Sequence, residues 1–310
     1  MKKTKMTALL LSLTLLLSAC GGSSAASGEA AGSEPADAAI CFTDMTGREI
    51  TLDEPAARVV ALSAADCEII YALGAEDILV GRGEYCDWPA EVLELPAVAS
   101  GSETNIEQIL ALDPDVLLMA DMAQTEEQVE QLENAGITVV VSDADNIEGV
   151  YQSITNTGAL LGKSEEAAAL VTDMQNTFAA IESESEDSGK TVYFEVSPLQ
   201  YGLWAAGADT FMNEVAEMMG LTNIFADVSG WCEISEEQVI QRAPDYIVTI
   251  SMYFGEGPTP VEEILSRAGW ENIPAVANSK ILNLANNELS RPGPRLVDGA
   301  QMLFDFVYGE

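Results

Sequence analysis

Apolar and polar residues in the first half of the chain alternate between short strand-like runs and amphipathic stretches. Near-continuous apolar runs of strand length are typical of parallel strands that are covered on both faces. Strands that alternate with helices indicate an α/β lobe. The pattern predicts a hairpin at 43–52 and two helices, at 65–73 and 125–135, that end at Gly74 and Gly136. The predicted strands are 58–63, 79–81, 115–120 and 137–141.

The middle of the chain has a helical period instead. A helix is predicted at 146–161, and a longer helix follows with Ser164 as its N-cap. The longer helix would span about 30 Å. We expect a weak C-terminal end at 182–187, where acidic residues oppose the helix dipole before Gly189. A single apolar stripe marks its buried face, formed by Ala167, Leu170, Val171, Met174, Phe178 and Ile181.

The alternation of strands and helices resumes after Gly189. The pattern predicts a helix at 210–219 that ends at Gly220. The predicted strands of this half are 191–196, 245–251 and 280–284. A second α/β lobe is therefore expected after the long helix.

Residues 107–118 and 237–248 form an internal repeat at a constant offset of 130 residues. Each copy starts with Glu-Gln, passes through a Pro-Asp turn and ends in an apolar strand. Asn105 and Ser235 precede the copies as capping residues, each with a glutamine three positions later. Two copies on either side of one long helix favour a duplicated lobe over the chance recurrence of a common helix–strand unit.

We therefore predict an α/β protein with two Rossmann-like lobes, joined by one long helix, and a ligand cleft between the lobes. Clefts between lobes are where small ligands usually bind. A helical strut should permit only a modest closing motion. The predicted boundaries are 40–162 for the N-terminal lobe, 163–188 for the connecting helix and 189–310 for the C-terminal lobe.

The N-terminus has the features of a secretory signal peptide. Residues 1–19 combine a basic start with an apolar run that is too short to span a bilayer. The Leu-Ser-Ala-Cys sequence that ends at Cys20 resembles a bacterial lipobox, which predicts lipidation of Cys20. An ordinary cleaved signal that contains a cysteine is the alternative. Residues 20–39 are rich in Gly, Ser, Ala and Glu, lack an apolar period and predict a flexible tether.

Composition excludes several classes of function. The chain has 13 basic and 51 acidic residues, a formal net charge of −38, so nucleic acid is a poor partner. It has no histidine, which excludes Ser-His-Asp and Cys-His catalysis and histidine-ligated zinc. An enzyme with paired carboxylates is disfavoured because no motif isolates such a pair. We predict no catalytic residues, no metal site, no cofactor and a monomeric chain.

Four cysteines follow Cys20: Cys41, Cys67, Cys86 and Cys232. None has C-x-x-C spacing, so a metal knuckle or redox motif is not expected. An exported protein can form disulfides. The pairing stays open, with a weak preference for a Cys67–Cys86 bridge and buried free thiols as the equal alternative.

Six segments, in order from about residue 41 to the C-terminus, resemble the helix-strut substrate-binding proteins of ABC importers that serve iron–siderophores, haem and cobalamin. They read TDMTGREITL, RVVALSAADCEIIYALGAEDILVG, YCDWP, NIEQILALDPDVLL, EEQVIQRAPDYIV and RPGPRLVDG. The resemblance implies an extracytoplasmic lipoprotein, anchored to the cell membrane, that captures a metal chelate and delivers it to a permease and its ATPase.

The same resemblance assigns a role to two glutamates. In the family, one acidic residue at the start of the corresponding helix in each lobe docks on arginines of the permease. Glu107 and Glu237 occupy those positions and the same place in the repeat. Stabilisation of the helix dipole, worth about 0.3–1 kcal/mol each, is the alternative reading, and both roles are compatible.

Aromatic residues at strand ends are the candidate ligand contacts. Tyr85, Trp88, Trp204 and Trp231 lie in predicted loops where an α/β cleft opens. Aromatic faces suit flat, bulky chelates. Tyr85 and Trp231 resemble ligand-facing aromatics of cobalamin-binding relatives. For Trp88 and Trp204, packing under loops is an equal alternative.

The identity of the chelate stays open. Arg291 begins an Arg-Pro-Gly-Pro-Arg loop, near a cleft arginine that contacts anionic chelates in siderophore-binding relatives; a capping or surface arginine is the alternative. Gly101 and Ala120 stand near positions where cobalamin-binding relatives have tryptophans. The absence of those two tryptophans counts against cobalamin itself, so a ferric siderophore and cobalamin or another corrinoid both stay open. Haem, held by Tyr or Met, is a further alternative. A surface sensor or adhesion lipoprotein with this fold is disfavoured by the docking glutamates.

Overall fold

The computed structural model describes residues 39–309, with the exception of 102–103, 121–125 and 254. The predicted signal peptide, Cys20 and all of the predicted tether except its last residue lie outside the described residues. Among the helices that the structure describes, none combines the length and the apolar character needed to cross a membrane.

The first half of the chain forms a hairpin and a parallel sheet. β1 (Ile40–Thr43) pairs antiparallel with β2 (Glu49–Leu52). The sheet has the order β5-β4-β3-β6-β7, and all its neighbouring strands are parallel. Its strands are β3 (Val59–Ala61), β4 (Leu79–Gly83), β5 (Ala97–Val98), β6 (Val116–Met119) and β7 (Thr138–Val141). The helices of this half are α1 (Ala64–Ala72), α2 (Ile106–Ala111) and α3 (Glu126–Asn134).

The predicted hairpin, strands and helices of this half are confirmed, with ends that differ by at most three residues. Strands β3 and β6 are buried along their whole length, as expected of central parallel strands with both faces covered. The sequence pattern missed β5, because two residues are too few to show a period.

The second half forms a six-stranded mixed sheet. Its main path is β11-β9-β8-β12-β13, and β10 pairs with the first part of β8. The strands are β8 (Lys190–Ser197), β9 (Trp204–Ala206), β10 (Leu221–Asn223), β11 (Trp231–Glu233), β12 (Tyr246–Thr249) and β13 (Ile281–Asn283). The helices are α6 (Phe211–Met218), α7 (Glu236–Arg242), α8 (Pro260–Ser266), α9 (Pro274–Ala277) and α10 (Leu296–Tyr308). Strands β9, β10 and β11 were not predicted, since each has only three residues.

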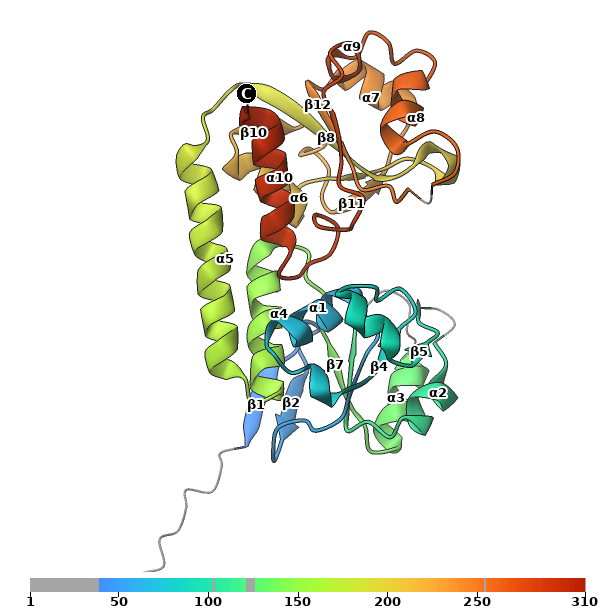
Figure 1. Cartoon of the computed structure of the whole chain (residues 1–310), viewed down its shortest axis with the longest axis vertical. Coiled ribbons are helices and arrows are strands. Elements are labelled where there is room, and N and C mark those ends of the chain that lie inside the picture. The colour runs from blue at the N-terminus through green and yellow to red at the C-terminus, as the bar shows by residue number, and fades with distance from the viewer. Residues whose placement is uncertain (1–38, 102–103, 121–125, 254, 310) are drawn as a thin grey trace, which may run out of the picture. The chain divides into compact units, whose positions relative to one another are not determined.

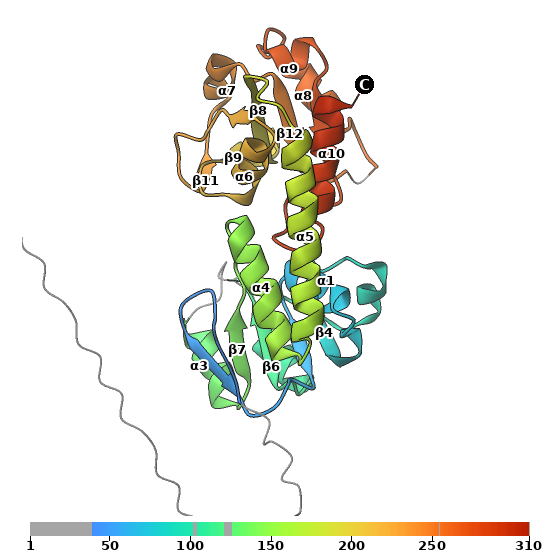
Figure 2. The same cartoon turned by 90° about the vertical axis from the view of Figure 1, so that its left-hand side faces the viewer.

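Two helices connect the sheets. α4 (Ile147–Leu160) packs along α5 (Ser164–Glu184), which also packs against α10, as both views show (Figures 1 and 2). The long connecting helix and its weak end within 182–187 are confirmed, but the predicted cap was wrong. Ser164 is the first helical residue rather than the cap, because Lys163 stands at the N-cap without a side-chain hydrogen bond. The helix ends at Glu184, before the acidic stretch is complete.

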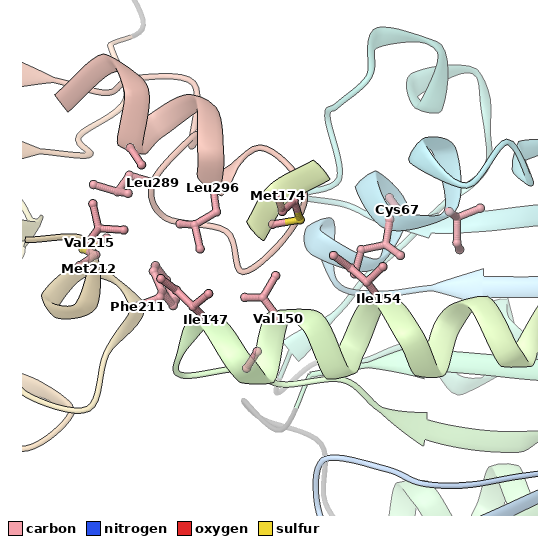
Figure 3. Packing of buried hydrophobic residues seen from close by; sticks show 14 of the residues in the cluster. Cys67, Ile147, Val150, Ile154, Met174, Phe211, Met212, Val215, Leu289 and Leu296 are labelled. Carbon is pink, nitrogen blue, oxygen red and sulfur yellow. The ribbon is translucent and has the colours of Figure 1, made fainter. Parts of the chain in front are cut away.

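One apolar cluster continues from the first sheet to the second half of the chain. In Figure 3, Cys67 and Ile154 lie at one end of this cluster, Val150 and Ile147 follow along α4, and Phe211 of α6 comes next. The first turn of α4 therefore lies against α6. Because water is excluded along this line, the cluster restrains how the two halves move against each other.

The internal repeat has matching structure in both copies. Asp113 and Ala243, which are 130 residues apart, both have positive φ, at 49° and 46°. Asp115 accepts a hydrogen bond from the Arg58 backbone at the start of β3, and Asp245 accepts one from the Thr191 backbone in β8. The Pro-Asp turn therefore anchors the neighbouring strand in the same way in each lobe, which supports a duplicated lobe.

Candidate ligand-binding site

The C-terminal ends of the parallel strands position the candidate site. Strand β3 leads into α1, and β4 leads into the loop that carries Tyr85 and Trp88. In the other lobe, β8 leads into the loop at 198–203, and β12 leads into the loop at 250–253 and 255–259. Ligands of α/β sheets usually bind outside the carboxyl ends of their strands.

A cavity of about 630 Å³ opens between the two loops that follow β8 and β12. Its volume is within the range of small-molecule sites. Its wall combines apolar, aromatic and hydrogen-bonding groups. The lining residues include Val196, Leu199, Tyr201, Met252, Tyr253 and Asn287. None of the five ligand residues predicted from the sequence lines this cavity. Trp204, however, comes directly after the 198–203 loop and pairs with Ser197 at the end of β8.

Sequence reasoning missed Tyr201 and Tyr253. Tyr201 is 77% exposed and Tyr253 is 44% exposed, although both are large and partly apolar. Both follow the C-terminal end of a predicted strand, which is the rule that selected Trp204. The same rule, applied to tyrosine as well as tryptophan, would have found them.

The loop after β4 contacts the loop before α10, although the two are about 200 residues apart in the sequence. Arg291 donates to Glu68 of α1 at 2.9 Å and to the Tyr85 backbone carbonyl at 3.2 Å. Its Nη1 also lies 2.7 Å from Asp87. Burial alone would lower the pKa of Arg291, but hydrogen bonds with Asp87 and Glu68 outweigh it and raise the pKa. An anionic ligand would have to displace protein carboxylates to reach this guanidinium.

Arg295 completes this cluster. It donates two hydrogen bonds to the buried Glu68, at 3.0 and 2.7 Å, and its guanidinium lies 4.7 Å from the centre of the Trp88 ring. A cation over an aromatic face is attractive. Trp88 thus has one face occupied by Arg295, while Tyr85 remains 72% exposed. We call Glu68, Asp87, Arg291 and Arg295 the interlobe ion cluster.

Two further hydrogen bonds join the lobes beside α4. The Phe211 backbone N–H donates to the Asp145 carbonyl, and the Ile147 backbone N–H donates to Glu214, both at 2.6 Å. Glu214 thereby satisfies a free N–H in the first turn of α4, where negative charge is favourable.

Trp204 and Trp231 lie on neighbouring strands of the second lobe. β11 pairs antiparallel with β9, which puts Trp231 opposite Ala206 and Glu233 opposite Trp204. Both tryptophans are more than a third exposed. Trp231 also packs edge-to-face on Phe211, with ring centroids 5.4 Å apart. Its ring is therefore held from one side and open on another, as a binding surface requires.

The two candidate docking glutamates occupy equivalent places. Asn105 caps α2 and Ser235 caps α7, and each side chain accepts from the backbone of a glutamine three residues later. Glu107 and Glu237 are then each the second residue of a helix, and both are exposed. The capping box predicted at Ser235 is confirmed, whereas Gln108 uses its side chain to bind the Ala99 backbone instead.

Within the described part of the chain, no group of three or more His, Cys, Asp or Glu side chains is arranged to hold a metal ion. Several of the described acidic residues instead form ion pairs, among them Asp44, Glu68 and Glu195.

Comparisons with known proteins agree with this geometry. Residues 59–288 match the family model described as periplasmic binding protein. The uncharacterized ABC transporter substrate-binding lipoprotein YvrC of Bacillus subtilis strain 168 is 31% identical, over 99% of this chain and 98% of that relative. A cobalamin-binding protein of Halobacterium salinarum is 29% identical, over 82% of this chain and 70% of its own.

Solved structures give the same result. A possible iron-binding, periplasmic solute-binding protein of Staphylococcus epidermidis matches with a TM-score of 0.68 and 29% identity, over 82% of this chain and all of that one. The vitamin B12 binding protein BtuF of Vibrio cholerae matches with a TM-score of 0.67 and 26% identity, over 82% and 97% of the two chains. The chain thus belongs to the periplasmic binding protein family and is an extracytoplasmic substrate-binding protein of the ABC-transporter type.

Proposed function

We propose that this protein captures a corrinoid in its cleft and delivers it to the permease of an ABC importer. The observation that carries the proposal is the set of exposed aromatic side chains at strand ends of both lobes: Tyr85, Trp88, Trp204 and Trp231. Exposed aromatic faces that are held by neighbouring contacts suit a large, flat macrocycle.

The charges around the cleft favour a corrinoid over an anionic ferric siderophore. The interlobe ion cluster contains two arginines and two carboxylates, so its formal charge is zero. The chain as a whole has a formal charge of −38, which repels anions. A corrinoid ring carries mainly amide side chains and does not depend on free cations. Relatives of this chain include cobalamin-binding proteins.

Binding of cyanocobalamin should quench the fluorescence of the purified chain with a Kd below about 10 μM, roughly −7 kcal/mol. Replacing Trp231 by Ala should weaken binding at least 10-fold, because a held aromatic anchor contributes about 2 kcal/mol or more. Titration with cyanocobalamin, cobinamide, haem and ferric siderophores measures this directly.

Two internal controls are available in the same chain. Trp270 is fully buried and donates to Glu236, so Trp270→Phe removes no ligand contact and should leave the affinity of the folded protein unchanged. Met302→Ala removes an exposed apolar side chain from α10 and should leave affinity unchanged. Tight binding of a ferric siderophore alone would overturn the corrinoid assignment, and failure of every probe would overturn the chelate class.

We further propose that Glu107 and Glu237 dock on the permease. Both are exposed second residues of short helices at equivalent repeat positions, as docking on a two-fold related permease requires. The double variant Glu107→Arg, Glu237→Arg should reduce ligand uptake by cells to background. Its ligand affinity should stay within about two-fold of the parent, because neither residue lines the cavity.

The matched control reverses two other exposed glutamates at the second position of a helix, Glu148 in α4 and Glu165 in α5. All four substitutions remove a favourable dipole interaction of about 0.3–1 kcal/mol. If the control loses uptake as completely as the docking variant, the glutamates act only on helix stability and the docking proposal is wrong.

The tether and anchor complete the proposed function. Cys20 would hold the binding protein at the membrane surface through residues 20–39, with lobes at 40–162 and 189–310 around the connecting helix. Cys20→Ala should release the protein from the membrane fraction into the medium without changing its affinity for cyanocobalamin. Retention of the variant in the membrane fraction would rule out lipidation at this cysteine.

A further inference from the structure

Two buried cysteines lie together under the Tyr85–Trp88 loop. Cys67 is in α1 and Cys86 follows β4, and neither side chain is exposed. Both thiols donate to the same backbone carbonyl, that of Ala61, with Sγ–O distances of 3.7 and 3.8 Å. A hydrogen bond with Cys86 and burial raise the pKa of Cys67 well above its usual value. All four cysteines that follow Cys20 are free thiols in this structure.

The other two cysteines are not placed to pair with them. Cys41 is exposed on β1 of the hairpin, where its thiol contacts Thr51. Cys232 is on β11 in the other lobe, where its thiol donates to the Ala205 carbonyl. Cys67 and Cys86 belong to one apolar cluster that contains neither Cys41 nor Cys232.

The chain around Cys86 is already held close to α1. The buried Arg82 donates from one nitrogen to the backbone carbonyls of Gly83, Glu84 and Cys86, at 3.0, 3.3 and 3.1 Å. The Cys86 thiol also approaches the Leu62 carbonyl at 3.7 Å. A loop fixed in this way keeps the two thiols adjacent, so little chain entropy is lost when they are joined.

The thiol pair lies next in sequence to the carboxylates that bind Arg291. Glu68 follows Cys67, and Asp87 follows Cys86. Nη1 of Arg291 lies 2.9 Å from the Glu68 carboxylate and 2.7 Å from the Asp87 carboxylate. A covalent link between the cysteines would therefore fix the spacing of the two carboxylates. It would also fix the base of the loop that presents Tyr85 and Trp88 to the cleft.

We propose that Cys67 and Cys86 are a disulfide-forming pair, and that the exported protein carries them as a disulfide that fastens the Tyr85–Trp88 loop to α1. Extracytoplasmic proteins form disulfides where the environment is oxidising. The oxidant is a disulfide compound, either a thiol oxidoreductase in its oxidised form or a small-molecule disulfide. One cysteine thiolate attacks that disulfide and releases the first thiol of the oxidant. The second cysteine then attacks the mixed disulfide and releases the other thiol, so two electrons and two protons pass to the oxidant.

The first experiment maps the pairing in the full chain. The protein is unfolded in guanidinium, refolded with a mixture of oxidised and reduced glutathione, unfolded again and treated with iodoacetamide before digestion and mass spectrometry. We expect a Cys67 peptide linked to a Cys86 peptide and lighter by two hydrogen atoms than the reduced pair. Cys41 and Cys232 should be fully alkylated. Equal alkylation of all four, or a link from Cys67 to Cys41 or Cys232, would overturn the proposal.

Cysteine variants distinguish stabilisation by the Cys67–Cys86 disulfide from a general effect of oxidation on stability. The oxidised parent should unfold at a higher guanidinium concentration than the reduced parent. Cys232→Ser should show the same difference, whereas Cys86→Ala should show none. Cys67→Ala provides a second test if Cys86→Ala does not fold. If oxidation shifts the unfolding midpoint of the Cys86→Ala variant as much as that of the parent, the assignment is contradicted.

Proteolysis tests whether the disulfide fastens the Tyr85–Trp88 loop. Chymotrypsin cleaves after exposed aromatic residues, and Tyr85 and Tyr201 are the two most exposed large hydrophobic side chains among the described residues. Oxidation should slow cleavage after Tyr85 several-fold and leave cleavage after Tyr201 unchanged, because Tyr201 lies in the other lobe. Equal rates after Tyr85 in the oxidised and reduced protein would show that the link does not fasten the loop.

Discussion

The Arg267→Met variant should lose about 3–5 kcal/mol of unfolding free energy at pH 7, because it leaves a buried carboxylate without its partner. Arg267 and Glu195 are only 1% exposed in their side chains. The guanidinium binds both oxygens of Glu195, at 2.6 and 3.0 Å, and also binds Glu263. It lies 4.5 Å from the centre of the buried Trp270 ring. Denaturant unfolding of parent and variant measures the loss.

The charge state of this pair follows from its contacts. Burial alone would lower the pKa of Arg267, but hydrogen bonds with Glu195 and Glu263 outweigh it, so the pKa is raised and the arginine stays charged. Burial already raises the pKa of Glu195 in the parent, although its hydrogen bonds with Arg267 oppose the rise. In the Arg267→Met variant, Glu195 keeps its burial and loses its main partner, so its folded-state pKa is expected to rise further. Stability lost in the variant should therefore be smaller at pH 4.5 than at pH 8.

Two further variants test whether the unpaired buried carboxylate of Glu195 causes the loss of stability. Adding Glu195→Gln to Arg267→Met removes the buried charge and should recover more than half of the loss. Lys163→Met breaks an exposed pair with Glu166 and should change stability by less than about 1 kcal/mol. A loss below about 1 kcal/mol in Arg267→Met at pH 7 would contradict this account of the buried pair.

The Asp66→Asn variant should be more stable than the parent at pH 8 by about 2–4 kcal/mol, with little difference near pH 4. Asp66 is completely buried at the start of α1, where it hydrogen-bonds to the Ser142 hydroxyl. Its other carboxylate oxygen has no hydrogen-bond partner in the structure. Burial, with a smaller contribution from the nearby Asp143, raises the pKa of Asp66 to about 7.

The sign of the effect follows from proton linkage. The unfolded chain releases the Asp66 proton near pH 3.9, whereas the folded protein keeps it until about pH 7. Between these values the folded state binds more protons, so rising pH lowers the stability of the parent. Each unit of pKa difference corresponds to about 1.4 kcal/mol. Asparagine has no proton to release and retains an oxygen that can accept from Ser142.

Chemical denaturation at pH 4, 6 and 8 checks this prediction. Asp53→Asn makes the same chemical change at an exposed position and should alter stability by less than about 0.5 kcal/mol at every pH. If the stability difference between Asp66→Asn and the parent is the same at pH 4 and pH 8, Asp66 does not titrate as its burial implies.

Parts of the fold and the site could be predicted because local patterns determine them. Buried strands β6 and β12 appear as apolar runs, and the cap at Ser235 appears as a serine with a glutamine three residues later. The position of Glu237 follows from that cap. Ser164 was misassigned because its residue type suits a cap, while the turn that precedes α5 puts Lys163 there instead.

Other parts of the site depend on residues that are distant in sequence. Glu68 and Arg291 are 223 positions apart, and no local pattern indicates that they meet. Arg291, which the sequence suggested as a cation for an anionic chelate, is instead bound by Glu68 and Asp87. The cavity beside Tyr201 and Met252 also arises only when two loops from different strands come together.

The sequence by itself determined the two α/β lobes, their connecting helix and the equivalent places of Glu107 and Glu237. Periodicity and capping are local patterns, and the 130-residue repeat is a similarity within the chain. All three can therefore be recognised in the sequence without knowledge of the structure. Only the tertiary structure decided which charges are neutralised in the cleft, which aromatic faces stay open and which cysteines lie together. Those properties depend on contacts between segments far apart in the chain, which packing and charge pairing select after the local elements have formed.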